Sequence, residues 1–226
     1  MLITGASRGF GAFLSMAFGT AGFHVVGVGR DKKELLLLKR SIEKDHGLCS
    51  TIVADLMTEL GQAAVARGIR EHDIDVLINN AGVNPEPISK KIAGNIADIN
   101  LILQTNTTAA IALCVAAHEH FVAQGRGTII NINSAAGLKG NFGEAVYCAS
   151  KFGLRGFSES VKDAWLKQGI WITDVYSGAM ATGMASHRSD VKDLIDPQEL
   201  ADFLIGLCSN RSFFVRDISV QKTRYS

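Results

Sequence analysis

Short apolar runs rich in valine and isoleucine alternate with longer amphipathic segments along this 226-residue chain. Seven runs are candidate strands, at residues 2–4, 24–29, 50–55, 75–79, 127–133, 170–176 and 215–221. Candidate helices between them include residues 11–21, 32–44, 99–123, 147–168 and 197–209. Strands that are apolar throughout and alternate with helices are typical of a parallel sheet covered on both faces. The pattern therefore predicts one α/β domain over residues 1–226, built on a doubly wound parallel sheet of about seven strands.

The composition excludes several other classes of protein. Lys and Arg number 23 against 22 Asp and Glu, which gives a formal charge of +1, and 47% of residues are apolar. These values disfavour disorder and a polyanion-binding tail, so no nucleic-acid partner is expected. The four cysteines form no C-x-x-C pair, and neither a disulfide framework nor a metal site is expected. We find no basic leader and no run of about 18 uncharged apolar residues, so we expect a cytoplasmic protein without a membrane partner.

A glycine-rich turn follows the first candidate strand directly and leads into a helix. It reads Thr4-Gly-Ala-Ser-Arg-Gly-Phe-Gly11. Glycines allow a tight turn, and the amides at a helix start favour a bound pyrophosphate. The spacing differs from G-x-G-x-x-G but resembles the T-G-x-x-x-G-x-G of the short-chain dehydrogenase/reductase family. That resemblance implies a Rossmann-like, three-layer α/β/α fold, with a dinucleotide bound by Gly5, Ser7, Arg8, Gly9, Phe10 and Gly11.

The end of the second candidate strand bears on the choice of cofactor. Gly29 stands where an acidic residue would accept a hydrogen bond from the ribose 2′-hydroxyl, and Arg30 follows it. Guanidinium groups of Arg30 and of Arg8 pair well with a 2′-phosphate, so NADP(H) is favoured. Asp31 leaves NAD(H) as an alternative.

Further motifs match the same family in chain order. Asp55-Leu56 resembles the pair that contacts adenine, and Asn79-Asn80-Ala81-Gly82 resembles the family's N-N-A-G. After the sixth candidate strand, Gly178 and Thr182 match a segment that contacts the nicotinamide carboxamide. Ser177 replaces the proline that is usual before Gly178. The resemblance thus implies that Asp55, Leu56, Asn80, Ala81, Gly82, Gly178 and Thr182 bind the cofactor.

The reacting groups are expected at the start of the fourth long helix. Tyr147 and Lys151 form a Y-x-x-x-K pair, and residues four apart share a helix face. A nearby cation is expected to lower the pKa of the phenol, which would then serve as general acid/base. With Ser134 and Asn106, these residues reproduce the order and spacing of the family's catalytic tetrad. In that family Ser134 would orient the substrate, Lys151 would also bind the nicotinamide ribose, and Asn106 would hold a water in a proton relay.

The expected activity is hydride transfer between NADP(H) and a small carbonyl or alcohol substrate. Irregular segments at 84–98 and 179–196 follow strands and are expected to form the substrate walls. Two alternatives are an NAD-dependent alcohol dehydrogenase and a non-catalytic protein that senses NADP(H). Relatives commonly pair through the long helices, so a homodimer or homotetramer is expected. Cys114, His118 and His120 lie on one candidate helix, but they do not supply a zinc site.

Overall fold

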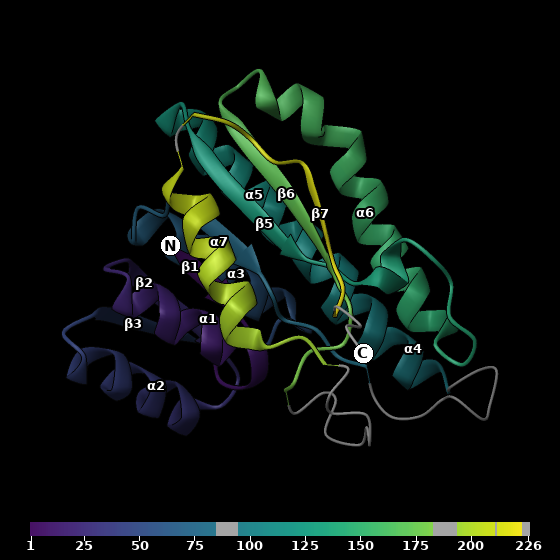
Figure 1. Cartoon of the computed structure of the whole chain (residues 1–226), viewed down its shortest axis with the longest axis horizontal. Coiled ribbons are helices and arrows are strands. Elements are labelled where there is room, and N and C mark those ends of the chain that lie inside the picture. Colours follow the sequence, from purple (N-terminus) through teal and green to yellow (C-terminus); the bar gives the residue numbers. More distant parts are fainter. Residues whose placement is uncertain (85–94, 183–193, 211, 223–226) are drawn as a thin grey trace.

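The computed structural model describes residues 1–84, 95–182, 194–210 and 212–222, and its centre is a seven-stranded sheet (Figure 1). The strands are β1 (Leu2–Thr4), β2 (His24–Gly29), β3 (Leu48–Val53), β4 (Val76–Asn79), β5 (Gly127–Ile132), β6 (Ile170–Ser177) and β7 (Asp217–Val220). Their order is β3-β2-β1-β4-β5-β6-β7, and every neighbouring pair is parallel. The predicted doubly wound sheet is confirmed. All carboxyl ends therefore meet at one edge of the sheet.

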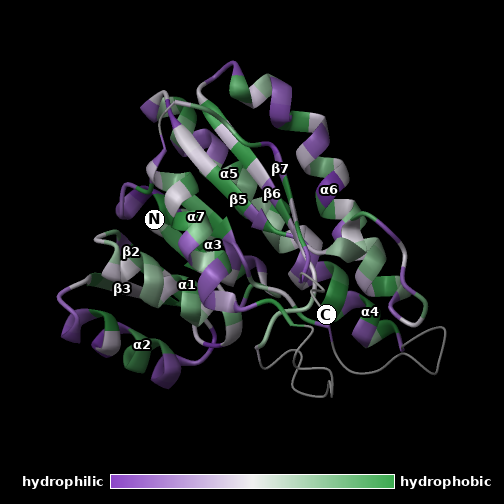
Figure 2. Ribbon diagram, viewed as in Figure 1, coloured by the Kyte–Doolittle hydropathy of each residue, from purple (hydrophilic) through white to green (hydrophobic). Residues whose placement is uncertain are grey.

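Helices cover both faces of the sheet and enclose two apolar cores. The helices are α1 (Gly9–Thr20), α2 (Lys32–Lys44), α3 (Glu59–Glu71), α4 (Ile96–Leu103), α5 (Ala109–Gln124), α6 (Ala145–Leu166) and α7 (Pro197–Ser209). One core packs α1, α2 and α7 on the sheet, and the other packs α3, α5 and α6. Figure 2 shows the hydrophobic residues gathered on the strands and on the helix faces against them. The predicted three-layer arrangement is confirmed.

Side-chain caps decide where several helices begin. Asp31 accepts hydrogen bonds from the first-turn amides of α2, and Asp196 does so for α7, and both helices keep their predicted bounds. Asn95 caps α4 in the same way, because its side chain accepts from the Asp98 amide at 2.9 Å. The prediction of an irregular segment up to Asp98 is therefore wrong at its end. Residues 85–94 and 183–193 of the two expected substrate walls lie outside the described residues.

The predicted helix 99–123 is a continuous helical segment that runs from α4 through a π-helical turn, η2 (Gln104–Thr108), into α5. By length and composition, Ile96–Gln124 could cross a membrane, although the polar residues Gln104–Thr108 interrupt its apolar run. In the structure this segment packs against β4, β5 and α6. Thr107 Oγ1 also donates to the main-chain oxygen of Ser150 on α6, at 2.8 Å. The segment is thus part of one helix layer, although only 33% of its most apolar window is buried.

A row of polar residues crosses the sheet at a single register. Asn79 on β4 pairs with Asn131 on β5, Asn131 pairs with Asp174 on β6, and Asp174 pairs with Asp217 on β7. The Asn79 amide donates to Asn131 Oδ1 at 3.0 Å, and the Asn131 amide donates to Asp174 Oδ1 at 3.1 Å. The carboxylate of Asp174 therefore fixes the direction in which both asparagine amides point.

Lys162 of α6 supplies the positive charge for this row. Its ammonium lies 2.8 Å from Asp174 Oδ2 and 2.7 Å from Asp217 Oδ1, and the Lys162 and Asp174 side chains are fully buried. Burial is the largest effect and would lower the pKa of Lys162, but the carboxylates of Asp174, Asp217 and Glu159 together raise it. Lys162 thus stays charged inside the fold, where its ammonium is bonded to Asp174 and Asp217 and neutralises their negative charge.

Removing this cation should destabilise the fold strongly. We expect Lys162→Met to lower the free energy of unfolding by about 3–5 kcal/mol, because it leaves the buried Asp174 carboxylate uncompensated. The double variant Lys162→Met/Asp174→Asn removes both charges and should recover at least half of that loss. Urea unfolding followed by circular dichroism measures both. Equal stability of the single and double variants would contradict this account.

Candidate active site

The turn between β1 and α1 leaves room for a phosphate. Gly5 and Gly9 have φ angles of +67° and +56°, which favour glycine. A Cβ on Gly11 would lie 2.1 Å from the Gly5 carbonyl oxygen, so only glycine fits there. The start of α1 has no side-chain cap and no acidic residue in its first turn, in contrast to α2. Its free amides and the helix dipole fit a pyrophosphate.

Thr4, at the end of β1, joins this turn to the end of β4. Its hydroxyl accepts hydrogen bonds from the amides of Asn80 and Ala81, each at 3.0 Å. The Asn80 side chain in turn donates to the Thr4 carbonyl at 2.8 Å. The glycine motif begins with Thr4, but the motif alone does not predict this contact. The signal that could have found it is its place at the end of a buried central strand.

The expected ribose end of the site lies where β2 ends. A Cβ on Gly29 would come 3.0 Å from the Ser7 hydroxyl, so the glycine lets Ser7 pack against the strand. Arg8 and Arg30 are exposed and lie on the two turns that follow β1 and β2. The Asp31 carboxylate is occupied as the cap of α2 and accepts from the Lys33 and Glu34 amides. This occupation makes Asp31 a weaker partner for a ribose hydroxyl.

Asp55 and Leu56 follow β3. Asp55 is exposed, and its carboxylate accepts from the Met57 amide at 3.0 Å. The Leu56 side chain is buried in the core under α3, so its main chain is the part left to face a ligand.

Asn106 and Lys151 meet at Gly82, and Tyr147 lies next to Lys151. A Cβ on Gly82 would lie 3.5 Å from Asn106 Oδ1 and 3.9 Å from Lys151 Nζ, which places this glycine between the two side chains. Lys151 Nζ donates to the Ile132 carbonyl at 3.0 Å and lies 5.8 Å from the centre of the Tyr147 ring. The structure therefore brings Asn106, Tyr147 and Lys151 to the carboxyl edge beside the glycine turn.

The acidity of Tyr147 differs from the expectation. Burial raises the pKa of Tyr147 to about 12, while a contact with the Ser134 hydroxyl lowers it and the charge of Glu144 raises it further. Burial also lowers the pKa of Lys151 to about 8, against the charge of Asp174, which raises it. The expected lowering of the Tyr147 pKa by Lys151 is wrong for this structure, because desolvation of the phenol is the larger effect.

Asn106 lies in the π-helical turn η2, and its side chain is already engaged. Its Oδ1 accepts from the Val83 amide at 2.8 Å, and its Nδ2 donates to the Val83 carbonyl at 2.9 Å and to the Ser150 hydroxyl at 3.1 Å. The side chain thus ties the segment after β4 to the start of α6. This geometry leaves the expected water-holding role to atoms other than the side-chain amide.

Gly178 and Thr182 lie in the segment after β6. The Gly178 amide donates to the Val220 carbonyl of β7 at 2.8 Å, and the Thr182 amide donates to the Met180 carbonyl at 2.7 Å. Met180 forms a parallel bridge with Ile195, so the segment is pinned to the residues before α7. Hydrogen bonds therefore fix this turn in the absence of the proline that Ser177 replaces.

Other polar clusters have structural explanations. Cys114 accepts from the Asn79 amide at 3.2 Å, and His118 stacks on Trp165 at 4.2 Å. Glu159, Asp174 and Asp217 lie close enough to share a cation, but Lys162 already supplies one.

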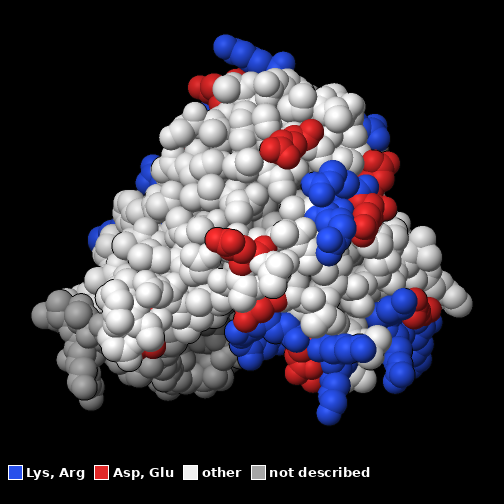
Figure 3. Space-filling view, turned by 180° about the vertical axis from the view of Figure 1, so that it is seen from behind, with Lys and Arg blue, Asp and Glu red and all other residues white. Residues whose placement is uncertain are grey.

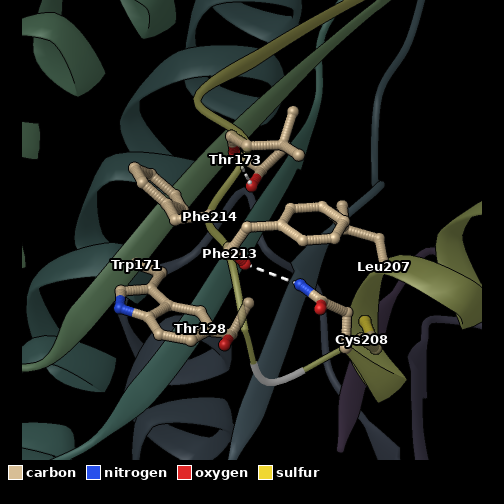
Figure 4. A pocket seen from close by; sticks show the side chains of 9 residues that line it. Thr128, Trp171, Thr173, Leu207, Cys208, Phe213 and Phe214 are labelled. Atoms are coloured by element: carbon tan, nitrogen blue, oxygen red, sulfur yellow. Dashed lines mark hydrogen bonds between the residues drawn. The ribbon is translucent and has the colours of Figure 1, made fainter.

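An apolar hollow lined by Trp171, Phe213 and Phe214 lies near the amino ends of β5 and β6, away from the carboxyl edge (Figure 4).

The site combines an open parallel sheet, an uncapped start of α1 and the pair Tyr147 and Lys151. This combination defines an α/β dinucleotide-dependent oxidoreductase. A family profile described as "short chain dehydrogenase" matches residues 1–193. The chain belongs to the short-chain dehydrogenase/reductase family, whose members act on CH–OH and C=O groups.

Known relatives agree with this assignment. A fatty acyl-CoA reductase from Acinetobacter baylyi is 31% identical, over 90% of this chain and 70% of its own. A 3-oxoacyl-[acyl-carrier-protein] reductase from Haemophilus influenzae is 31% identical, over 84% of this chain and 77% of its own. A metagenomic short-chain oxidoreductase solved with NADP is 30% identical, with a TM-score of 0.83 over 99% of this chain and 96% of its own.

Loss of the Thr4 hydroxyl should weaken this edge of the sheet. We expect Thr4→Val, which keeps the shape of the side chain, to lower the free energy of unfolding by about 2 kcal/mol, because it leaves the Asn80 and Ala81 amides without their acceptor. Thr4→Ser keeps the hydroxyl and should cost about 0.8 kcal/mol, the value of one buried methyl group. Urea unfolding compares them, and a Thr4→Val protein as stable as Thr4→Ser would refute the role of the hydroxyl.

Proposed function

We propose that the chain is an NADP(H)-dependent carbonyl reductase in which Tyr147 is the general acid/base. The observation that carries this proposal is the convergence of Ser134, Tyr147 and Lys151 at the carboxyl edge, beside a glycine turn with free helix amides. When bound, the nicotinamide supplies or accepts the hydride. The chain itself supplies the proton, orients the carbonyl and excludes water from the phenol.

The titration of Tyr147 and Lys151 favours the reductive direction. With a pKa raised to about 12, the phenol keeps its proton at neutral pH and is ready to donate it to a developing alkoxide. Lys151, with a pKa lowered to about 8, exchanges its proton near neutral pH and is suited to resupplying the phenol. Ser134 would bond the substrate oxygen, and Asn106 would keep the segment around Gly82 in place for the cofactor.

NADP(H) is preferred over NAD(H) in this proposal. Arg8 and Arg30 are exposed on the turns beside the expected ribose, Gly29 offers no carboxylate, and Asp31 is occupied as a helix cap. The relative solved with NADP supports the same choice. An NAD-dependent alcohol dehydrogenase and a non-catalytic NADP(H) sensor are the outcomes that the two experiments below would reveal instead.

We also propose that residues 1–226 act as one catalytic domain and that the chain forms a homodimer or homotetramer. The back of the molecule, where α5 lies, has broad areas with few charged side chains, and the charged side chains are densest toward one side and the bottom of this view (Figure 3). Val115 and Val122 of α5 are 43% and 45% exposed, and Phe152 of α6 is 41% exposed. A second copy of the chain would cover this surface, and the molecular mass in solution measures the number of copies that associate.

Tyr147→Phe removes the proton donor and keeps the ring. We expect kcat for ketone reduction to fall by about 10²–10⁴-fold, the usual contribution of general acid catalysis, while NADPH affinity changes little. Tyr176→Phe is the matched control, because the Tyr176 hydroxyl is buried with no hydrogen-bond partner among the described residues. NADPH absorbance with a panel of ketones and aldehydes follows turnover. Full activity of Tyr147→Phe would remove Tyr147 from the mechanism, and binding without turnover in the unmodified protein would favour the sensor.

Arg30→Ala should reduce the preference for NADP(H). One charge-assisted contact is worth about 1.5–3 kcal/mol, so we expect the NADPH Kd to rise about ten- to a hundredfold and the NADH Kd to change little. Lys32→Ala, two residues further along the chain, is the matched control, and we expect it to leave the ratio of the NADPH Kd to the NADH Kd unchanged. Fluorescence titration measures both dissociation constants for the unmodified protein and for each variant. An unaltered NADPH preference in Arg30→Ala would refute the ribose-phosphate assignment.

A further inference from the structure

Asn133 joins the end of β5 to the first turns of α6. Its Oδ1 accepts a hydrogen bond from the Ser134 main-chain amide at 3.0 Å, and its Nδ2 donates to the Lys151 carbonyl at 3.3 Å. The residue is buried, with 3% of its surface exposed. Water therefore does not replace these bonds when they break, and each of them is costly to lose. One side-chain amide thus links the main chains of two expected reacting residues.

Lys151 is bonded at both of its ends to this corner of the sheet. Its ammonium donates to the carbonyl of Ile132, the residue before Asn133, at 3.0 Å. Its own main-chain carbonyl accepts the bond from the Asn133 side chain. The Asn133 main-chain amide also donates to the Val175 carbonyl of β6 at 2.9 Å, which anchors the corner in the sheet. The position of α6 relative to Ser134 therefore depends on the Asn133 side chain.

Gly137, in the 3₁₀ turn η3 (Ala135–Gly137), leaves the space that this amide occupies. A Cβ on Gly137 would lie 2.8 Å from Asn133 Oδ1 and 3.2 Å from the Lys151 main-chain oxygen. The φ angle of Gly137 is not positive, so its backbone conformation does not itself require glycine. The close approach of the Asn133 side chain explains the glycine instead, and a methyl group there would push the amide away from its partners.

We propose that Asn133 is a positioning residue, which sets the separation between the Ser134 hydroxyl and the pair Tyr147 and Lys151. A ketone oxygen has to accept from the Ser134 hydroxyl and from the Tyr147 phenol at once, so an error of about 1 Å in that separation is enough to slow the reaction about a hundredfold. Asn133 acts through its neighbours, since both of its side-chain hydrogen bonds end on main-chain atoms. This inference rests on the proposed reductase function and adds a residue to it.

Asn133→Ala removes the amide and keeps the residues expected to meet the substrate. We expect kcat for ketone reduction to fall about ten- to a hundredfold, because the two donors no longer meet at one oxygen. The NADPH Kd should change little, since the glycine turn after β1 stays as it is. NADPH absorbance measures kcat, and fluorescence titration measures the Kd.

Ser158→Ala is the matched control for stability. Ser158 is also buried on α6, and its hydroxyl bonds to the Leu154 carbonyl and to the Asp174 carboxylate, each at 3.1 Å. Its loss removes buried hydrogen bonds from the same helix, beyond the part that carries Tyr147 and Lys151. We expect Ser158→Ala to lower the free energy of unfolding in urea about as much as Asn133→Ala does, and to keep kcat.

Gly137→Ala tests the same contact with Asn133 still in place. The added methyl group should displace the Asn133 amide, so we expect kcat to fall by a similar factor. In Asn133→Ala/Gly137→Ala there is no amide left to displace, and kcat should be no lower than in Asn133→Ala alone. A loss in the double variant equal to the product of the two single losses would show that the residues act independently, and would overturn the proposal.

The remaining outcomes separate this inference from the proposed function. Unaltered kcat in Asn133→Ala, or an equal loss of kcat in Ser158→Ala, would refute the positioning role. If Asn133→Ala does not fold, Gly137→Ala decides, because the proposal requires its kcat to fall while NADPH binding persists. Turnover that Tyr147→Phe abolishes and Asn133→Ala keeps would refute this inference alone. An unmodified protein without turnover on the whole panel of ketones and aldehydes would refute both.

Discussion

The whole site depends on the contact that Thr4 makes between the two central strands. A parallel sheet binds ligands where neighbouring strands end, and those ends hold their separation only if their last polar groups are bonded to each other. The Thr4 hydroxyl meets two amides of the segment after β4, and Asn80 returns a bond to the Thr4 carbonyl. The glycine turn is thereby placed against Asn80 and Ala81, and the next residue, Gly82, is placed between Asn106 and Lys151.

A row of hydrogen-bonded polar side chains links the strands on the other side of this contact. The row from Asn79 through Asn131 to Asp174 is bonded from strand to strand at one register, and Lys162 neutralises its acidic end. In an otherwise apolar sheet such a row penalises any other register, because a shifted strand would bury these polar groups without partners. The same helix, α6, carries Tyr147 and Lys151 at its start and Lys162 near its end. The reacting groups and the neutralising charge thus share one rigid element.

Much of the fold follows from local sequence, and the exceptions have tertiary causes. Apolar runs located all seven strands, and the caps Asp31 and Asp196 agree with the predicted bounds of α2 and α7. The sequence does not predict the start of α4, because its cap, Asn95, is a residue type that is equally common in loops. The π-helical turn at Asn106 is not predicted either, because it has no periodic pattern of apolar residues. The expected site residues matched family motifs, but the pKa of Tyr147 did not follow the prediction. Its value depends on burial by distant segments, which spacing along one helix does not report.

Asp217 ties the edge strand β7 to the interior of the protein. β7 is one of the two edge strands of the described sheet, and an edge strand offers unpaired main-chain groups that can recruit another chain. Its first residue, Asp217, bonds Lys162 in the interior, so peeling β7 away would strip a ligand from a buried ammonium. Fraying at this margin therefore carries an electrostatic penalty, and that penalty protects the chain against strand exchange and edge-to-edge aggregation.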